Sequence, residues 1–385
     1  MAAGMLESVL RRDDRSPIVV AGAGPAGLAA AIHLAQHGYP VIVHEAKGEV
    51  GSRFGGDFQG LENWTTEDDV LEVMRAQGLT TDFEALPCRR GLAYDPRRQQ
   101  YEIGSREPLF YMVERGPGPH TLDTALLRQA EALGVEIRFN SRLKHLSGEG
   151  ILATGPKVAD AIAVGYHFDT DMEDGFWVIC DDNLAPKGYA YLLVMNGRGN
   201  VKTCMFEGFS REKDYVERTV ETFTDLIGLD MKNPVDHGGS GNFRIPSMAT
   251  SGKHPQIGEH AGFQDTLWGF GMRLAMTSGI LAARSQMKGD SYERLWRQAM
   301  MSQMQASVVN RWLFSRLGNR GYGWFLARYS SSTDLRGALR SHYRMSFLKR
   351  MLSQLARFHY RSHRLDQGCH QSDCTCIYCR SRCQN

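Results

Sequence analysis

The 385-residue sequence lacks the long hydrophobic segments that mark membrane and secreted proteins. No stretch of about 18 apolar residues occurs, so we expect no membrane-spanning helix. Residues 1–17 contain no uninterrupted apolar core of the kind found in signal peptides. Internal repeats and low-complexity segments are also missing. We therefore expect a cytoplasmic protein. Because 42% of its residues are hydrophobic, the chain can build two joined domains around real cores.

Cysteine is scarce as well, and its distribution argues against the disulfide framework of a secreted domain. The chain has eight cysteines, of which Cys88, Cys180 and Cys204 are isolated. The other five lie within residues 369–385, and such crowding in a reducing compartment favours a metal site or a redox role. The candidate ligands for zinc or an iron–sulfur cluster are Cys374, Cys376, Cys379 and Cys383. A redox-active or disulfide pair and an inert tail remain alternatives for this segment.

Net charge is small, at +2, but it is unevenly distributed. Twelve lysines and arginines lie between residues 311 and 364, against a single acid, Asp334. Residues 345–364 predict an amphipathic helix with cations opposite an apolar face. That apolar face carries Phe347, Leu348, Met351, Leu352, Leu355 and Phe358. Either the helix packs on the body with a solvated basic face, or it binds an anionic membrane surface or an acidic electron-carrier protein. We expect no nucleic-acid partner.

Residues 18–45 form the most informative segment of the chain. They predict a strand, a Gly-rich turn, an alanine-rich helix and a second strand that ends at Glu45. Gly22 permits the tight turn, Gly24 lets the backbone approach a pyrophosphate, and Gly27 lets the helix pack closely on the strand. The helix then presents free N–H groups to the phosphates. Since Glu45 follows the turn by roughly 20 residues, where a ribose-binding carboxylate lies, the segment predicts a dinucleotide-binding unit.

The order of the remaining segments predicts an α/β fold. It consists of a Rossmann-like FAD-binding domain with an inserted antiparallel β-sheet substrate domain and a helical C-terminal region. A helix, a stop at Gly134 and a strand occupy residues 121–140, and a short strand at 151–155 returns to the nucleotide sheet. The expected parts are the FAD-binding domain (1–100, continued at 101–160 and 251–290), the substrate domain (161–250), the basic helical region (291–368) and the Cys-rich tail (369–385).

Four motifs resemble those of the FAD-dependent geranylgeranyl reductase family, which is related to the aromatic-hydroxylase flavoproteins. The first is the GAGPAGLAAA turn with its later Glu45, and the second is Arg115 followed by Leu122-Asp123. The third, residues 186–191, is similar to a Pro-x-x-Tyr-x-Trp substrate motif but has tyrosine in place of tryptophan. The fourth, residues 257–279, resembles the second flavin motif, with glutamate in place of its usual aspartate. The resemblance extends over residues 18–283.

This resemblance implies bound FAD and names the residues that bind it. They are Gly22, Gly24, Pro25, Ala26, Gly27, Glu45, Ala46, Arg53, Arg115, Glu259, Gly271 and Met272. A flavin needs backbone donors at its pyrimidine edge, because negative charge develops there on reduction. The turn and helix start at Gly271 and Met272 are expected to supply them. Glu259 is expected near the ribityl chain or the pyrophosphate.

The implied activity is reduction of carbon–carbon double bonds in an isoprenoid, polyene or related hydrophobic substrate by hydride transfer from reduced flavin. Pro186, Tyr189 and Tyr191 are the expected substrate residues, and the two tyrosines share one face of a strand. The same tyrosines would equally well fill a gap between the domains. No residue is singled out as catalytic or as the proton donor. The chain shows no second dinucleotide fingerprint, so the electron source is either transiently bound NADPH or a small electron-carrier protein.

Two other functions remain open at this point. One is an FAD-dependent aromatic-type monooxygenase, which is disfavoured because Ala153-Thr154-Gly155-Pro156 stands where hydroxylases of this superfamily have an Ala-Asp-Gly segment. The other is a non-catalytic, redox-sensing flavoprotein that acts through the Cys-rich tail.

Overall fold

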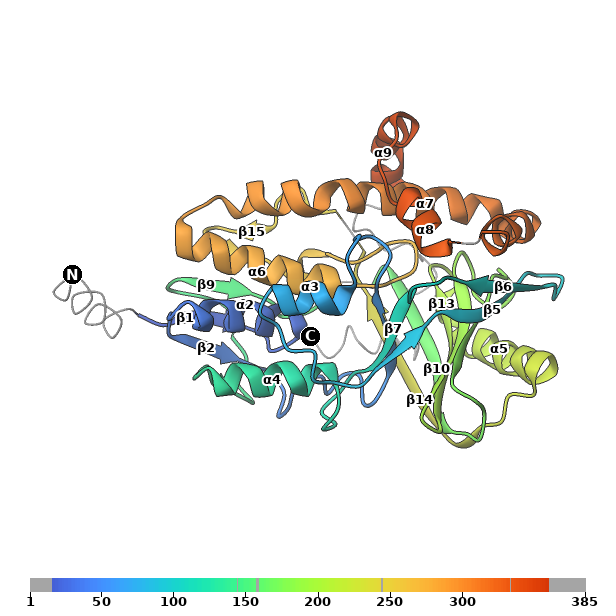
Figure 1. Cartoon of the computed structure of the whole chain (residues 1–385), viewed down its shortest axis with the longest axis horizontal. Helices are drawn as coiled ribbons and strands as arrows, with labels where there is room; N and C mark the ends of the chain where they lie inside the picture. Colours follow the sequence, from blue (N-terminus) through green and yellow to red (C-terminus); the bar gives the residue numbers. More distant parts are fainter. Residues whose placement is uncertain (1–15, 144, 157–158, 244, 333, 360–385) are drawn as a thin grey trace.

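Two sheets divide the molecule into a nucleotide half and a larger antiparallel half (Figure 1). The computed structural model describes residues 16–143, 145–156, 159–243, 245–332 and 334–359. The Cys-rich tail, with Cys374, Cys376, Cys379 and Cys383, lies outside these described residues. The metal prediction therefore stays a prediction.

A four-stranded parallel sheet forms the core of the nucleotide half, in the order β8-β2-β1-β9. Its strands are β1 (Ile18–Ala21), β2 (Val41–His44), β8 (Glu136–Arg138) and β9 (Gly150–Leu152). The helices packed with it are α2 (Pro25–Gln36), α4 (Leu122–Ala132) and α6 (Met272–Lys288). Parallel strands that are covered on both faces have apolar sequences, and Val20, Val43 and Ile151 are fully buried. The late helix α6 packs directly on α2, although 235 residues lie between the end of α2 and the start of α6.

A three-stranded antiparallel sheet, in the order β3-β7-β4, connects the two halves. It contains β3 (Phe58–Glu62), β4 (Ala85–Cys88) and β7 (Phe110–Glu114), and helix α3 (Val70–Ala76) follows β3. Asp69 caps α3 by accepting a hydrogen bond from the Leu71 N–H at 2.9 Å.

The second half is a seven-stranded sheet in the order β14-β10-β13-β12-β11-β5-β6. Its strands are β5 (Arg90–Tyr94), β6 (Gln100–Gly104), β10 (Ala161–Asp169), β11 (Gly175–Ile179), β12 (Tyr189–Met195), β13 (Arg198–Met205) and β14 (Lys232–Gly241). All neighbours pair antiparallel except β11 and β5. Helix α5 (Glu212–Ile227) packs against β13 and β10. The shorter elements are β15 (Thr250–Ser251), β16 (His254–Pro255), η1 (Phe209–Arg211) and η2 (Gly258–Ala261).

The predicted fold class is confirmed, but one boundary differs. Residues 90–104 were assigned to the nucleotide domain, whereas β5 and β6 extend the antiparallel sheet instead. The reason is that β11 leaves an unpaired edge after its hairpin with β12, and β5 pairs with that edge in parallel register.

The C-terminal helices run across both halves (Figure 1). They are α7 (Tyr292–Ser330), which has a non-helical kink at Gly318 (φ 54°), α8 (Leu335–His342) and α9 (Phe347–His359). Helix α7 packs on α6 at one end and on β5 and β6 at the other. Within the part of the chain that the structure describes, none of the helices is long and apolar enough to cross a membrane.

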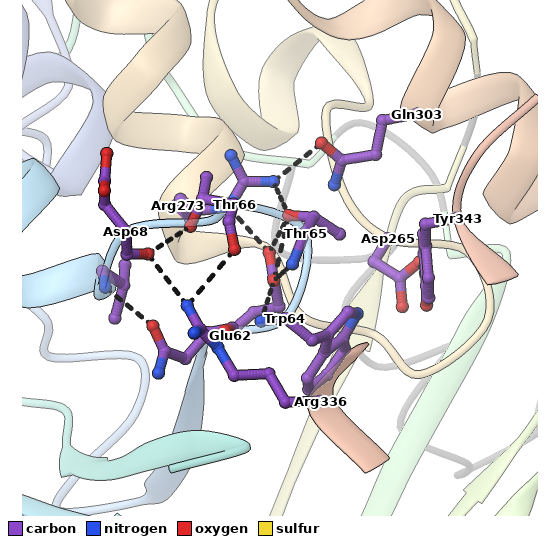
Figure 2. A network of polar contacts seen from close by, with 12 residues as sticks. Glu62, Trp64, Thr65, Thr66, Asp68, Asp265, Arg273, Gln303, Arg336 and Tyr343 are labelled. Carbon is purple, nitrogen blue, oxygen red and sulfur yellow. Dashed lines mark hydrogen bonds and ion pairs between the residues drawn. The ribbon is translucent and has the colours of Figure 1, made fainter. Parts of the chain in front are cut away.

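Two arginines bind the loop after β3 to these helices (Figure 2). Arg273, in the first turn of α6, contacts Glu62 at 2.6 Å and Gln303 of α7 at 2.7 Å. Arg336 of α8 donates hydrogen bonds to the backbone carbonyls of residues 63, 66, 67 and 68. Burial raises the pKa of Glu62, but the Arg273 charge outweighs this effect and keeps it below its usual value. The loop that carries Trp64 is therefore held firmly.

Candidate active site

A large cavity of about 2920 Å³ lies between the nucleotide half, the antiparallel sheet and the C-terminal helices. Pockets for one small ligand usually measure about 300–1,000 Å³. The volume here is therefore large enough for a dinucleotide and a second sizeable molecule. One end of the cavity is lined by the Gly-rich turn after β1, and the other end is lined mainly by aromatic side chains.

At the nucleotide end of the cavity, glycines let neighbouring segments and a ligand approach the backbone closely. Gly22 has a φ of 112°, and a Cβ there would collide with the carbonyl oxygen of Ala153. A Cβ on Gly27 would collide in turn with the Gly22 carbonyl. At Gly24 no described atom lies within 4 Å of the Cβ position, so this side of the turn is open to a ligand. Helix α2 begins there, and no described side chain caps its first turn. Its N–H groups remain available to phosphate oxygens.

Glu45 lies at the end of β2, next to this turn. Its carboxylate accepts hydrogen bonds from the backbone N–H of Ala23 at 2.8 Å and of Lys47 at 3.0 Å. The acid is thereby held beside the open turn, where the sequence predicts that it meets a ribose.

The predicted residues from separate segments meet at the middle of the cavity. Arg53 forms an ion pair with Glu259 at 3.1 Å, which joins the loop after β2 to the turn η2. Arg115 forms a bidentate pair with Asp123 at 2.7 and 2.9 Å, and both side chains are buried. Arg115 also donates to Gln59 of β3 at 3.0 Å, and its guanidinium lies 4.2 Å from the ring centroid of Phe54, so it supports the Gly-rich loop (residues 48–56) that precedes β3.

The start of α6 provides a second ligand-facing helix terminus. Gly271 is the N-cap residue, and among the described residues no side chain caps this helix and no acid lies in its first turn. Gln264 lies beside Gly271 and lines the cavity. Its Nε2 donates to the Gly269 carbonyl at 2.7 Å, while its buried Oε1 finds no hydrogen-bond partner among the described residues. An unpaired buried acceptor at the cavity wall indicates a missing ligand donor.

Most of the predicted site residues line this one cavity. Those that do are Gly22, Gly24, Pro25, Ala26, Glu45, Ala46, Arg53, Arg115, Glu259, Gly271, Met272, Tyr189 and Tyr191. Gly27 is placed behind the turn, where it allows α2 to pack on β1. Pro186 precedes β12 and is not among the residues that line the cavity, so its contact with substrate stays a prediction. Its carbonyl accepts a hydrogen bond from Phe206.

The far end of the cavity is an aromatic chamber, and sequence reasoning identified only two of its residues. Tyr189 and Tyr191 project from β12 with their rings 5.9 Å apart. Trp268 packs edge-on against Tyr189 at 5.4 Å, and Phe270 packs edge-on against Trp64 at 4.7 Å. The remaining aromatic residues of the chamber are Phe110, Phe176, Phe325 and Tyr329. These residues come from many separate elements, so no local motif pointed to them.

A buried arginine of α7 holds one wall of this chamber. Arg311 is 0% exposed and donates to the carbonyls of Thr266, Leu267 and Lys187. It therefore fastens the Trp268 loop to the segment that enters β12. Arg311 and Arg336 belong to the basic stretch between residues 311 and 364, but both are buried and bound to backbone carbonyls, so neither is available to a partner.

A polar cluster lies on the cavity-facing side of the antiparallel sheet. Asp57, directly after the Gly-rich loop, accepts from Lys202, from Asn200 at 2.7 Å and from His167 at 3.0 Å. Lys202 also donates to Nδ1 of His237 at 2.8 Å. Burial raises the pKa of Asp57, but the Lys202 charge and the His167 hydrogen bond outweigh it and keep the pKa well below its usual range.

The three described cysteines contribute no reactive thiol. Cys88, Cys180 and Cys204 are buried and free. Burial raises the pKa of Cys88 and of Cys180 to about 12, and that of Cys204 to about 11. Thiols that stay protonated at neutral pH are poor nucleophiles and poor metal ligands.

Comparison with known proteins agrees with this geometry. Residues 15–155 match the family model described as an FAD binding domain. A digeranylgeranylglycerophospholipid reductase of Haloferax volcanii is 22% identical over 375 residues, covering 80% of this chain and 88% of that protein. A geranylgeranyl bacteriochlorophyll reductase-like structure from Thermoplasma acidophilum superposes with a TM-score of 0.70 at 17% identity, over 88% of this chain and 98% of that one. The chain is an FAD-binding flavoprotein, and over most of its length it is similar to these two reductase-related proteins.

Other flavoproteins share the fold at lower similarity. The p-nitrophenol 4-monooxygenase of Pseudomonas putida superposes with a TM-score of 0.59 at 14% identity, over 85% of this chain and 96% of that one. At this level of sequence identity, the similarity is evidence for a shared fold alone. The open turn at Gly24, the uncapped start of α6 and the unpaired Gln264 acceptor all fit a bound FAD molecule.

Proposed function

We propose that this protein is an FAD-dependent oxidoreductase that reduces carbon–carbon double bonds of an isoprenoid or polyene-like lipid. The observation that carries the proposal is the aromatic chamber that continues the FAD cavity, since its Trp, Phe and Tyr side chains suit a long apolar chain. The similarity to a digeranylgeranylglycerophospholipid reductase supports the same substrate class.

In this scheme, the residues of the chain bind and orient the cofactor and the substrate. Bound FAD supplies the hydride chemistry. Arg53 and Glu259 connect the two cofactor-binding segments, and the N–H groups at the start of α6 stabilise negative charge at their end of the cavity. Tyr189 and Tyr191 face the chamber, and Trp268 and Phe270 close it from the opposite loop. Their tilted and edge-on packing excludes water from a bound apolar chain.

The test is an anaerobic turnover with a chemically reduced enzyme. The holoenzyme is reduced with dithionite, freed of excess reductant, and mixed with geranylgeraniol in detergent micelles. Reappearance of the oxidised flavin spectrum, with product that has gained two hydrogen atoms per reduced double bond, supports the proposal. An absorbance that stays at the reduced level, with unchanged lipid, contradicts it.

The alternative is an aromatic-type monooxygenase, which the shared fold with p-nitrophenol 4-monooxygenase favours. It differs in needing oxygen. Oxygen consumption coupled to a hydroxylated product, with no anaerobic reaction, would establish the alternative.

We also propose that α9 meets an anionic membrane surface. Phe347 is 80% exposed, and Leu348, Met351, Leu355 and Phe358 are 61–66% exposed. Leu352 and Ala356 pack toward α7, so the expectation of a helix packed on the body holds only for that side. The sequence of α9 contains Lys349, Arg350 and Arg357 and no acid. An exposed apolar face beside cations suits anionic lipid more than an acidic protein, whose surface offers less apolar area.

A further inference from the structure

The antiparallel sheet carries a row of polar side chains that reaches from its edge into the cavity. The register places Tyr191 opposite Lys202, Lys202 opposite Gly165, and Gly165 opposite His237. Residues that face each other across neighbouring strands project from the same side of the sheet. Tyr191, Lys202 and His237 therefore form one line across β12, β13, β10 and β14, and all three line the cavity.

Gly165 makes the contact between Lys202 and His237 possible. It occupies the position between them on β10, and a Cβ there would collide with the Val201 carbonyl. Without a side chain at this position, the Lys202 ammonium reaches Nδ1 of His237 at 2.8 Å across the intervening strand.

The cluster is organised around a cation that the protein itself supplies. Carboxylate and imidazole atoms of Asp57, His167 and His237 lie within 4.8 Å of one another, a spacing that also suits a metal ion. The Lys202 ammonium is bonded to Asp57 and to His237, so the positive charge is already present. His167 stacks on His237 at 4.0 Å, and Arg53 donates to Ser240 on the same edge strand.

The two ends of the row differ in exposure. Lys202 is 2% exposed and lies on the cavity side, whereas His237 is only partly buried, on the edge strand β14. Burial lowers the pKa of Lys202, although Asp57 opposes this effect. Burial and the Lys202 charge lower the pKa of His237 to about 4. A buried ammonium with a lowered pKa is a better acid than a solvated one.

We propose that Lys202 is the catalytic acid of the double-bond reduction and that His237 is its proton supply from solvent. This inference rests on the proposed function. In the step, the π bond of the substrate breaks, one carbon receives a hydride from reduced FAD, and the other receives the proton of a Lys202 N–H bond. Bound FAD would supply the electron pair with the hydride, and Lys202 would be left as a neutral amine. Loss of the ammonium charge then makes His237 more basic, so it takes up a solvent proton and returns it to Lys202. Asp57 acts as a positioning residue.

The first test measures the contact without any cofactor chemistry. In the protein labelled with ¹⁵N-histidine and stripped of flavin, an NMR pH titration reports the pKa of His237. Lys202→Met is expected to raise that pKa, because the neighbouring ammonium is gone. Lys232→Met is the matched control, since Lys232 lies on β14 but is exposed and paired with Asp171. An unchanged His237 pKa in Lys202→Met overturns the proposal.

The second test measures the reaction. Lys202→Met alone leaves the Asp57 carboxylate buried without its partner. The double variant Asp57→Asn/Lys202→Met removes both charges, so we expect it to fold and use it in this test. The reduced double variant is mixed anaerobically with geranylgeraniol. We expect its flavin to reoxidise at least about 100-fold more slowly than that of the wild type, with unchanged flavin content and lipid affinity. We expect the wild-type rate to fall at high pH, where Lys202 loses its proton, and we expect this fall to be absent in the double variant. Reoxidation at the wild-type rate refutes the relay alone, whereas a wild type that fails to reoxidise refutes the proposed function and the relay together.

Discussion

Replacing Arg311 by methionine should destabilise the fold and open the substrate chamber. The side chain is 0% exposed and donates to three backbone carbonyls, at 3.0 Å for Thr266, at 2.6 Å for Lys187 and to Leu267. Hydrogen bonds to charged groups contribute about 1.5–3 kcal/mol each, and desolvation of the guanidinium offsets part of their sum. We expect a net loss of about 3–5 kcal/mol in the free energy of unfolding.

Urea denaturation followed by tryptophan fluorescence measures this loss. With a slope of about 3 kcal/mol/M, the midpoint should fall by about 1–2 M. Arg316→Met is the control, because Arg316 is exposed on the same helix and should change stability by no more than about 0.5 kcal/mol. Geranylgeraniol affinity should fall more than FAD affinity, since the lost contacts hold the Trp268 loop. An Arg311→Met protein that unfolds at the wild-type urea concentration would refute this reasoning.

Three further predictions concern the turn, the polar cluster and the last helix. Gly22→Ala should purify without yellow flavin, because its Cβ collides with Ala153. Gly134→Ala, at φ 81° but in open space, should keep the colour in an absorbance spectrum. Urea titrations at several pH values measure how the free energy of unfolding falls toward acid pH. In Asp57→Asn this fall should be less steep than in the wild type. The depressed pKa of Asp57 means that its carboxylate stabilises the fold above 3.8, its unperturbed value, and that this stabilisation is lost as the pH falls below it. An equally steep fall of the free energy of unfolding in Asp57→Asn would contradict this prediction. Leu348→Asp/Met351→Asp should abolish co-sedimentation with phosphatidylglycerol vesicles, and Gln354→Asp on the same helix should retain most of it. Equal sedimentation of both variants would exclude α9 as the contact.

The elements around the nucleotide could be read from sequence because their signals are local. Gly22, Gly24 and Glu45 fall within one strand–helix–strand segment, and Gly134 ends α4 as its position indicated. The antiparallel sheet expected within residues 161–250 is present there, because β10, β11, β12, β13 and β14 all lie in this range. Side-chain spacing along a short segment fixes both kinds of element without knowledge of distant partners.

The chamber and the polar row could not be read in this way, because each depends on long-range pairing. Strand β5 pairs with β11, which begins 81 residues after β5 ends. This pairing places Phe176 and Ile103 in the wall of the cavity. Lys202 and His237 meet only because the register places Gly165 between them. Arg311 and Arg336 have the sequence appearance of surface cations, and only the carbonyls of distant loops explain their burial.

The central claim is that one cavity holds FAD and a long apolar substrate at the same time. Calorimetric titration of geranylgeraniol into the yellow holoenzyme, with the flavin spectrum recorded alongside, tests it most directly. The account predicts saturable binding of one lipid per flavin, a perturbed flavin spectrum and no release of FAD. Displacement of the flavin by the lipid, or no binding to the holoenzyme, would contradict it.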